Sequence, residues 1–151
     1  MIASTIWKNL ISTLKNNPTL AQYINNVFEC RRFNIEPDSL PCIMLEPVKD
    51  GEIAKDYNQI QDLYFYVDLY AFSSSNVQEF KKSIAGDSDY KGILDIENDI
   101  RACISSSYSL GDTVIDIKID PVIFDELDLG KYPVRGLLMP LKILYRQTDG
   151  Y

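Results

Sequence analysis

The stretch DLYFYVDLYAF, residues 62 to 72, predicts a β-strand with two apolar faces. Alternate residues of a strand point to opposite sides of a sheet. One side of this strand carries Leu63, Phe65, Val67, Leu69 and Ala71. The other side carries Tyr64, Tyr66, Asp68, Tyr70 and Phe72, and is nearly as apolar. A strand with one solvated face alternates apolar with charged residues, so we expect both sides of this strand to be covered.

Further strands are expected before and after this stretch. VFECRRF (27–33) and CIMLEPV (42–48) predict two strands that precede it, and DTVIDIKID (112–120) and VRGLLMPLKILYR (134–146) predict two that follow. The aliphatic side of the first of these later strands is Thr113, Ile115, Ile117 and Ile119. Pro140 cannot donate a ladder hydrogen bond, so we expect an edge or a bulge there. The segment FDELDLGKYP, between these two strands, has the composition of a turn.

Helices are expected at residues 2–14, where apolar side chains recur at helical spacing, and at 18–25, after a cap at Asn17. A helical region from about residue 76 to 85 and a helix over 90–106 lie between the two groups of strands. This order predicts one α+β domain over residues 1–151, with an antiparallel sheet of four to five strands and helices on one face. The helix residues expected to meet the sheet are Ile6, Leu10, Ile93, Ile100 and Ile104.

The polar segment 49–61, KDGEIAKDYNQIQ, has few core residues, and we expect a long hairpin loop or a flexible arm there. The side chains in it that suit anchoring to a neighbour or a docking partner are Ile53, Tyr57 and Ile60.

The composition limits the possible partners. The 151 residues include 15 basic and 22 acidic ones, which give a net charge of -7. Such a field repels nucleic-acid phosphates, so stable binding to DNA or RNA is not expected. The negative net charge suits a surface that DNA passes without adhering. MIASTIWKNL lacks the pattern of a secretory signal, and no apolar run reaches the roughly 20 residues of a membrane span, so we expect a soluble protein without a membrane partner.

The residues of common catalytic and metal sites are scarce. The sequence has no histidine, which removes the most frequent general base and metal ligand. The three cysteines, Cys30, Cys42 and Cys103, have no metal-site spacing, and we expect all three to be buried in a reduced protein. The acidic groups that could act together are Asp87/Asp89, Glu97/Asp99, Asp116/Asp120 and Asp125/Glu126/Asp128, and we interpret each as solvated. We therefore expect no enzyme activity, no cofactor and no metal.

The feature of the sequence that does indicate a function is an apolar surface on the side of the sheet away from the helices. The residues that form it are Tyr64, Tyr66, Tyr70, Phe72, Leu138 and Leu144. A soluble monomer seldom exposes several hundred Å² of contiguous apolar surface. Two coverings are possible: the N-terminal helices or segment 49–61 of the same chain, or another copy of the protein. We favour the second, because tyrosine suits interfaces.

The order of these features resembles that of tail terminator (tail-completion) proteins of long-tailed bacteriophages. The segments that carry the resemblance are IWKNLISTL, LPCIMLEP, the polar arm, YFYVDLYAF, ILDIENDIRACI and PLKILYR. The resemblance implies a virion protein that is assembled in the host cytoplasm and located at the head–tail junction. It implies a ring, usually hexameric, that caps the tail-tube protein, joins the neck or connector protein, and lets DNA pass without specific binding. It also implies subunit contacts near Tyr64, Tyr66 and Tyr70, tube or neck contacts near the arm, and no catalytic residues.

Two other interpretations remain open. A head-completion protein or neck adaptor shares the size, acidity and lack of reactive groups, so that partner data are needed to separate it from a terminator. A monomeric, non-viral binding domain would show one mass at all concentrations by light scattering.

Overall fold

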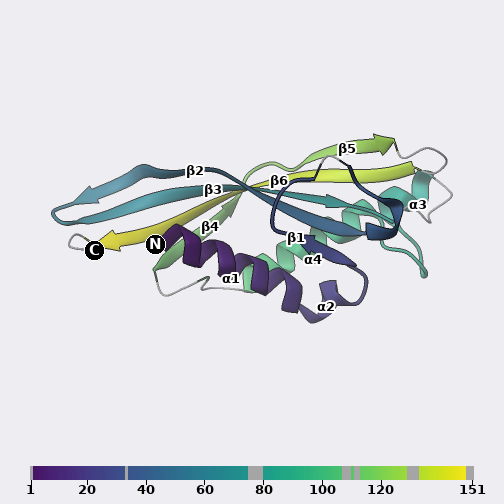
Figure 1. Cartoon of the computed structure of the whole chain (residues 1–151), viewed down its shortest axis with the longest axis horizontal. Helices are drawn as coiled ribbons and strands as arrows, with labels where there is room; N and C mark the ends of the chain where they lie inside the picture. Colours follow the sequence, from purple (N-terminus) through teal and green to yellow (C-terminus); the bar gives the residue numbers. More distant parts are fainter. Residues whose placement is uncertain are drawn as a thin grey trace.

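The computed structural model describes residues 2–32, 34–74, 80–106, 110, 113–128 and 133–148, which form one sheet with helices beside it (Figure 1). The helices are α1 (Ile2–Asn16), α2 (Pro18–Ala21), the short 3₁₀ helix η1 (Pro37–Ser39), α3 (Phe80–Ala85) and α4 (Ile93–Ser106). The strands are β1 (Asn26–Phe28), β2 (Cys42–Tyr57), β3 (Ile60–Phe72), β4 (Val114–Ile119), β5 (Ile123–Asp128) and β6 (Pro133–Thr148).

The sheet places β1, β2, β3, β6 and β4 side by side, and β5 pairs with the remaining part of β6. β1 runs parallel to β2, and the other pairs are antiparallel. The expected α+β class is confirmed. The sheet differs from the antiparallel sheet of four to five strands that we expected, because it is mixed and has six strands among the described residues. The additional strand is β5, which from Phe124 onward falls in the segment that we interpreted as a turn. Its local composition favours turns, but the long strand β6 supplies a complete ladder partner for it.

Several element boundaries also differ from the sequence-based expectation. β1 is limited to Asn26–Phe28, so residues 29–32 lie outside the strand that we expected. The expected cap at Asn17 is confirmed, because its side-chain oxygen accepts a hydrogen bond from the Leu20 N–H at 3.0 Å. The helix that follows ends at Ala21 instead of continuing to about residue 25. Part of the helical region expected from residue 76 lies outside the described residues.

Pro140 lies where β6 changes partners, which confirms the expectation of a local edge. On one side of β6, β4 pairs with residues up to Leu141 and β5 pairs with residues up to Leu138. The Pro140 carbonyl faces this side and accepts a hydrogen bond from the Asp120 N–H at 3.0 Å. In an antiparallel ladder the N–H and C=O of one residue point the same way. The missing N–H of Pro140 therefore falls in the gap between β4 and β5, and the pairing with β3 is undisturbed.

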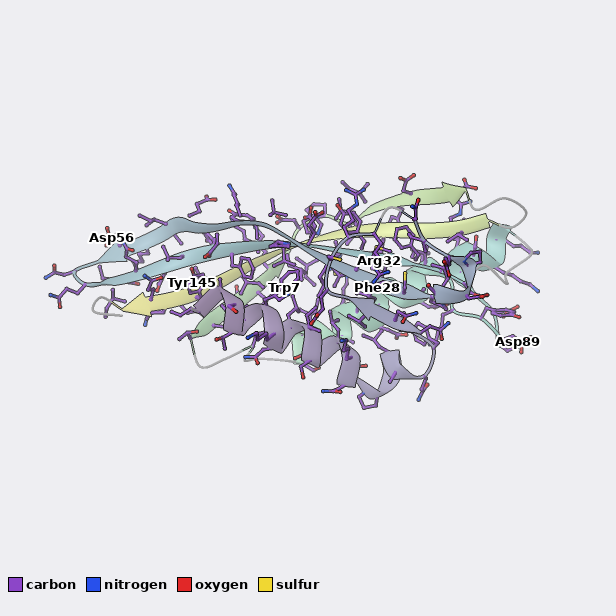
Figure 2. All side chains as sticks on the ribbon, viewed as in Figure 1. Trp7, Phe28, Arg32, Asp56, Asp89 and Tyr145 are labelled. Atoms are coloured by element: carbon purple, nitrogen blue, oxygen red, sulfur yellow. The ribbon has the colours of Figure 1, made fainter. Side chains whose placement is uncertain are left out.

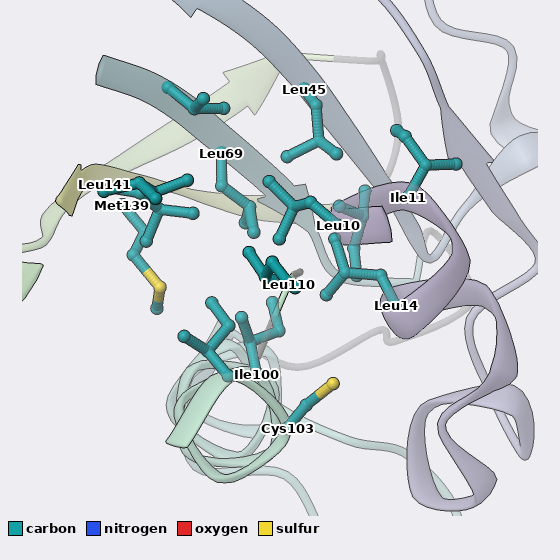
Figure 3. Close-up of a cluster of buried hydrophobic side chains, with 14 of the residues drawn as sticks. Leu10, Ile11, Leu14, Leu45, Leu69, Ile100, Cys103, Leu110, Met139 and Leu141 are labelled. Carbon is teal, nitrogen blue, oxygen red and sulfur yellow. The ribbon is translucent and has the colours of Figure 1, made fainter. Parts of the chain in front are cut away.

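The main hydrophobic core lies between the sheet and the helices α1 and α4 (Figure 3). Leu10, Ile11 and Leu14 of α1 converge there with Ile100 and Cys103 of α4. The strand residues that meet them in Figure 3 are Leu45, Leu69, Met139 and Leu141. The five helix residues that the sequence assigned to this contact (Ile6, Leu10, Ile93, Ile100 and Ile104) are all buried, so this expectation is confirmed.

A register shift in β4 changes which side chains reach the core. Val114 pairs with Tyr145 and Asp116 with Leu144, so Ile115 is the additional residue of a bulge. The side chain of Ile115 is consequently 46% exposed, and Val114 packs against the core in its place. The strict alternation from Thr113 to Ile119 that the sequence indicated is therefore wrong at its beginning.

The segment 49–61, called the arm below, is a regular continuation of the β2–β3 hairpin and not a loop. Only Asn58 and Gln59 form the turn, and Gln59 has a positive φ of 69°. β2 has register shifts at two places within the arm and at a third just before it, and in the arm it has no described partner on the side away from β3. Bulges of this kind discourage edge-to-edge pairing with other chains. Figure 1 shows the arm projecting beyond the N-terminal end of α1, at the opposite end of the molecule from α3 and β5.

The central strand and the helices should share one folding unit. We expect Leu69→Ala to lower the free energy of unfolding by about 3 kcal/mol, because it removes a completely buried side chain from between the sheet and both helices. Leu94→Ala is the matched control, since Leu94 is 45% exposed, and it should cost less than about 1 kcal/mol. Urea unfolding followed by circular dichroism measures both values. Equal losses for the two variants would contradict this description of the core.

Candidate functional site: the outer face of the sheet

The outer face is the side of the sheet opposite α1 and α4, and it carries the aromatic residues of β3. Cross-strand partners share a face, so the register determines what surrounds each ring. Tyr64 lies between Glu52 and Leu144, and Tyr66 lies between Lys49 and Lys142. Further along, Asp68 lies between Glu46 and Pro140, Tyr70 between Met44 and Leu138, and Phe72 between Cys42 and Gly136.

One end of the outer face is covered by residues 29–32 and 34–41 of the same chain. After β1 this segment packs over the sheet, and it forms a second, smaller cluster with the end of β3. The buried residues of this cluster are Leu40, Cys42, Met44 and Val134, and Phe28, Ile35, Tyr70 and Phe72 pack against them. The guanidinium of Arg31 lies 4.6 Å from the centre of the Tyr70 ring. Neither the N-terminal helices nor the arm provides this cover, although those were the intrachain candidates from sequence.

The other end of the outer face is open and combines aromatic rings with lysines. The rings of Tyr64 and Tyr66 lie 6.0 Å apart with a tilt of 52°. The Nζ atom of Lys142 lies 4.2 Å from the centre of the Tyr64 ring, and that of Lys49 lies 4.6 Å from the centre of the Tyr66 ring. Cations over aromatic faces are attracted by the ring quadrupole. This end is therefore a partly exposed apolar surface with positive charge above it.

Hydrogen bonds hold Tyr66 in this arrangement. Its hydroxyl is hydrogen-bonded to the Glu52 carboxylate, which raises the pKa of Tyr66 and lowers the pKa of Glu52. Lys49 Nζ also lies 3.0 Å from a Glu52 oxygen. A hydrogen bond to Tyr66 raises the pKa of Lys142. The phenol is thus neutral and the two lysines are charged at physiological pH.

The middle of the outer face carries carboxylates that oppose each other. Glu46 and Asp68 are direct cross-strand partners on β2 and β3. Burial raises the pKa of Asp68, and the charge of Glu46 raises it further, while Arg31 acts in the other direction. Like charges directly opposite one another destabilise a sheet. This acidic spot separates the covered end from the open end.

Two contacts attach the β2–β3 hairpin, in and next to the arm, to β6. Asp62 is buried, and its carboxylate receives hydrogen bonds from Arg146 Nε at 2.9 Å and from Arg146 Nη2 at 3.3 Å. On the helix side, the hydroxyl of the buried Tyr145 donates to Asp50 Oδ1 at 2.8 Å. Burial and this hydrogen bond raise the pKa of Tyr145. Figure 2 shows Asp56 at the far end of the arm.

The structure brings the six predicted contact residues (Tyr64, Tyr66, Tyr70, Phe72, Leu138 and Leu144) onto the outer face, and each is half-buried within the chain. They fall into two groups. Tyr64, Tyr66 and Leu144 lie at the open end. Tyr70, its cross-strand partner Leu138, and Phe72 lie at the covered end, where Tyr70 and Phe72 pack against the second cluster. Their role in subunit contacts remains a prediction.

The three predicted arm anchors lie on both sides of the hairpin. Ile53 pairs with the core residue Leu63 and is 56% exposed. Tyr57 and Ile60 are paired with each other at the tip, and Tyr57 is 36% exposed. The arm therefore presents apolar side chains to solvent, and their docking role remains a prediction.

Sequence reasoning missed a second exposed apolar group, at the end opposite the arm. Its members are Ile84, Leu94, Ile123 and Phe124. Leu94 stands on the helix whose other apolar residues we assigned to the core, and Ile84 stands on the helical region to which we assigned no contact. Ile123 and Phe124 begin the strand of which the remainder falls in the segment that we interpreted as a turn. No local signal marks them, because their exposure depends on where α3, α4 and β5 end in space.

The acidic groups considered from sequence mostly have structural partners. Asp87 Oδ1 accepts hydrogen bonds from the backbone N–H groups of Asp89 and Tyr90, at 2.8 and 2.9 Å, an arrangement typical of a turn. Glu97 pairs with Arg101 at 2.9 Å. Asp99 accepts a hydrogen bond from the Tyr23 hydroxyl at 2.7 Å. Among the described residues there is no group of three or more side chains that could hold a metal ion.

Two of the three cysteines match the expectation. Cys42 and Cys103 are buried, and burial raises the pKa of the Cys42 thiol to about 12. Cys30 is exposed, which corrects the expectation that all three are buried. Its position follows from the early end of β1, which leaves residue 30 in the segment that leads across the sheet.

Comparisons of the chain with protein-family models and with curated proteins found no match. Within the described part of the chain, none of the helices combines the length and hydrophobicity that crossing a bilayer requires.

The Asp62–Arg146 pair should make the attachment of the arm sensitive to acid. Hydrogen bonds from Arg146 hold the pKa of Asp62 below its ordinary value. A lowered folded-state pKa stabilises the protein above the unfolded-state value, about pH 4, and this stabilisation is lost as the pH falls through the folded-state pKa. We expect Asp62→Asn to lower the thermal midpoint at pH 7 and to lose less stability than the wild type below about pH 4.

Differential scanning fluorimetry across pH measures this difference. Asp56→Asn is the control, because Asp56 is an exposed carboxylate at the tip of the same arm. If Asp62→Asn and the wild type lose stability in parallel on acidification, the pair does not contribute as described.

Proposed function

We propose that the chain is a structural virion protein, a tail terminator of a long-tailed bacteriophage. Copies form a ring, of about six subunits by the resemblance described above, that caps the tail tube and joins it to the neck or connector. The protein is assembled in the host cytoplasm and works in the virion at the head–tail junction. It is not an enzyme in this proposal, and its function is mechanical.

The observation that carries the proposal is the open end of the outer face. Tyr64, Tyr66 and Leu144 remain partly exposed on a sheet whose opposite side buries the main hydrophobic core against α1 and α4. Aromatic side chains are enriched in the buried centres of interfaces. A second subunit is the simplest cover for them, and a head-to-tail contact closes into a ring when the rotation between subunits allows it.

The arm supports the same proposal. It projects from the body of the protein and presents Ile53 and Tyr57 to solvent on a hairpin held by Asp62 and Arg146. Such a projection suits contacts with the tail-tube protein or with the neck protein. The net charge of -7 suits a channel that DNA passes without adhering.

The proposal predicts assembly through Tyr66. We expect Tyr66→Asp to leave the fold and solubility intact but to reduce the particle mass to that of one chain, because the new carboxylate would be desolvated in the contact. Tyr66→Phe keeps the ring and removes only the hydroxyl, so it should still assemble. Tyr90→Asp is a further control, since Tyr90 is 39% exposed on another part of the surface.

Light scattering over a wide concentration range, together with negative-stain microscopy, gives the mass and shape of the particles. Annular particles for the wild type and Tyr66→Phe, and single chains for Tyr66→Asp, are the expected result. A wild type of one-chain mass at every concentration would favour the monomeric binding domain. Rings that bind the connector but do not stop growth of the tail tube would identify a neck adaptor instead.

A further inference from the structure

The segment that covers one end of the outer face places little of itself in the interior. It consists of residues 29–32 and 34–40, between β1 and β2, and we call it the strap. Of these described residues only Leu40 is buried, and Ile35 and Ser39 are half-buried. The strap therefore covers an apolar surface while contributing few side chains to it.

Two contacts between the middle of the strap and the sheet are of weak kinds. The guanidinium of Arg31 lies 4.6 Å from the centre of the Tyr70 ring, and the backbone N–H of Arg32 donates to Met44 Sδ at 3.4 Å. A thioether sulfur is a weak acceptor, and the attraction between an exposed cation and a ring is modest. Little free energy is therefore needed to break either contact.

Both ends of the strap are fixed to the sheet. One end follows Phe28 of β1, which pairs with Met44. At the other end the Leu40 carbonyl accepts a hydrogen bond from Asn25 Nδ2 at 2.7 Å, and the Asn25 N–H donates to the Pro41 carbonyl at 2.8 Å. The middle of the strap can therefore move while its ends stay attached.

The cluster beneath the strap is separate from the main core, because the sheet lies between them. Cys42 and Met44 of β2 project to the outer face, whereas Ile43 and Leu45 project to the helix side. Lifting the strap leaves the packing of the sheet against α1 and α4 in place. A region with few contacts of its own opens at a lower free energy than the whole protein.

We propose that the strap is a displaceable cover, which opens as a unit while the main core stays folded. Opening exposes Met44, Tyr70 and Phe72, and the exposed aromatic side of β3 then extends from Tyr64 to Phe72. The strap thus controls how much apolar surface the chain presents to its surroundings. This inference does not depend on the ring proposed above.

The three native cysteines provide the test. Cys30 is exposed on the strap, Cys42 is buried beneath it, and Cys103 is buried in the main core. Iodoacetamide reacts with accessible thiolates, so a buried thiol is labelled only after the structure over it opens. Mass spectrometry of the digested protein gives the labelling rate of each cysteine.

We expect Cys30 to react first, and Cys42 to react at least about tenfold faster than Cys103. The labelling rate of Cys42 should also rise less steeply with urea than that of Cys103, because opening of the strap exposes less surface than global unfolding.

A strap variant and a matched control extend the test. Arg31→Ala with Ile35→Ala should raise the labelling rate of Cys42 at least about fivefold and leave that of Cys103 unchanged, because both side chains lie over the outer face. Arg101→Ala removes an ion pair with Glu97 on α4 and should leave the Cys42 rate unchanged. Thermal midpoints establish that both variants are folded.

Equal labelling rates of Cys42 and Cys103 in the wild type, with the same urea dependence, would overturn the inference, because the cluster would then open only with global unfolding. A strap variant that speeds both cysteines equally would overturn it too. The labelling is measured on single chains at high dilution, so its result is separate from the outcome of the assembly experiment.

Discussion

The ladder between β3 and β6 is the constraint on which the rest of the structure depends. All thirteen residues of β3 pair with β6, from Ile60 opposite Thr148 to Phe72 opposite Gly136. The side-chain period of a strand is two, so a shift of one residue would exchange the two faces completely. The observed register places Val67 and Leu69 against the helices and leaves the tyrosines on the other side. Both the core and the candidate site follow from this pairing.

The length of the ladder also explains why the molecule is elongated. The helices cover only the middle and one end of the two long strands, and the hairpin continues beyond them as the arm (Figure 1). Tyr145 with Asp50 near the base of the arm, and Asp62 with Arg146 nearer its tip, replace helix packing there. Polar pairs, one between the neighbouring strands β3 and β6 and one from β6 across to β2, thus hold the sheet together where the helices end.

The outer face divides into zones because different segments cover it. Residues 29–32 and 34–41 cover Tyr70 and Phe72, and the carboxylates of Glu46 and Asp68 occupy the middle. Tyr64 and Tyr66 remain open beneath lysines. A uniformly apolar face would favour aggregation, whereas alternating charge and aromatic rings restrict which surfaces can bind. This division is what makes the open end a specific contact surface in the proposed ring.

Much of this protein could be predicted from local sequence pattern. The alternation over residues 62–72, the helical stripe of α1 and the cap at Asn17 depend on neighbours in the chain, and the structure reproduces them. The lack of histidine likewise limits the chemistry without any knowledge of the fold.

Other features were decided by tertiary contacts. β5 is a strand because β6 offers it a partner, Ile115 is exposed because β4 shifts register, and the arm is ordered as strand because β3 and β6 continue beside it. The path of residues 29–32 and 34–41 over Tyr70 depends on side chains far apart in sequence. The physical reason is the same in each case. Local pattern determines which faces are apolar, while only the folded chain determines what lies against them.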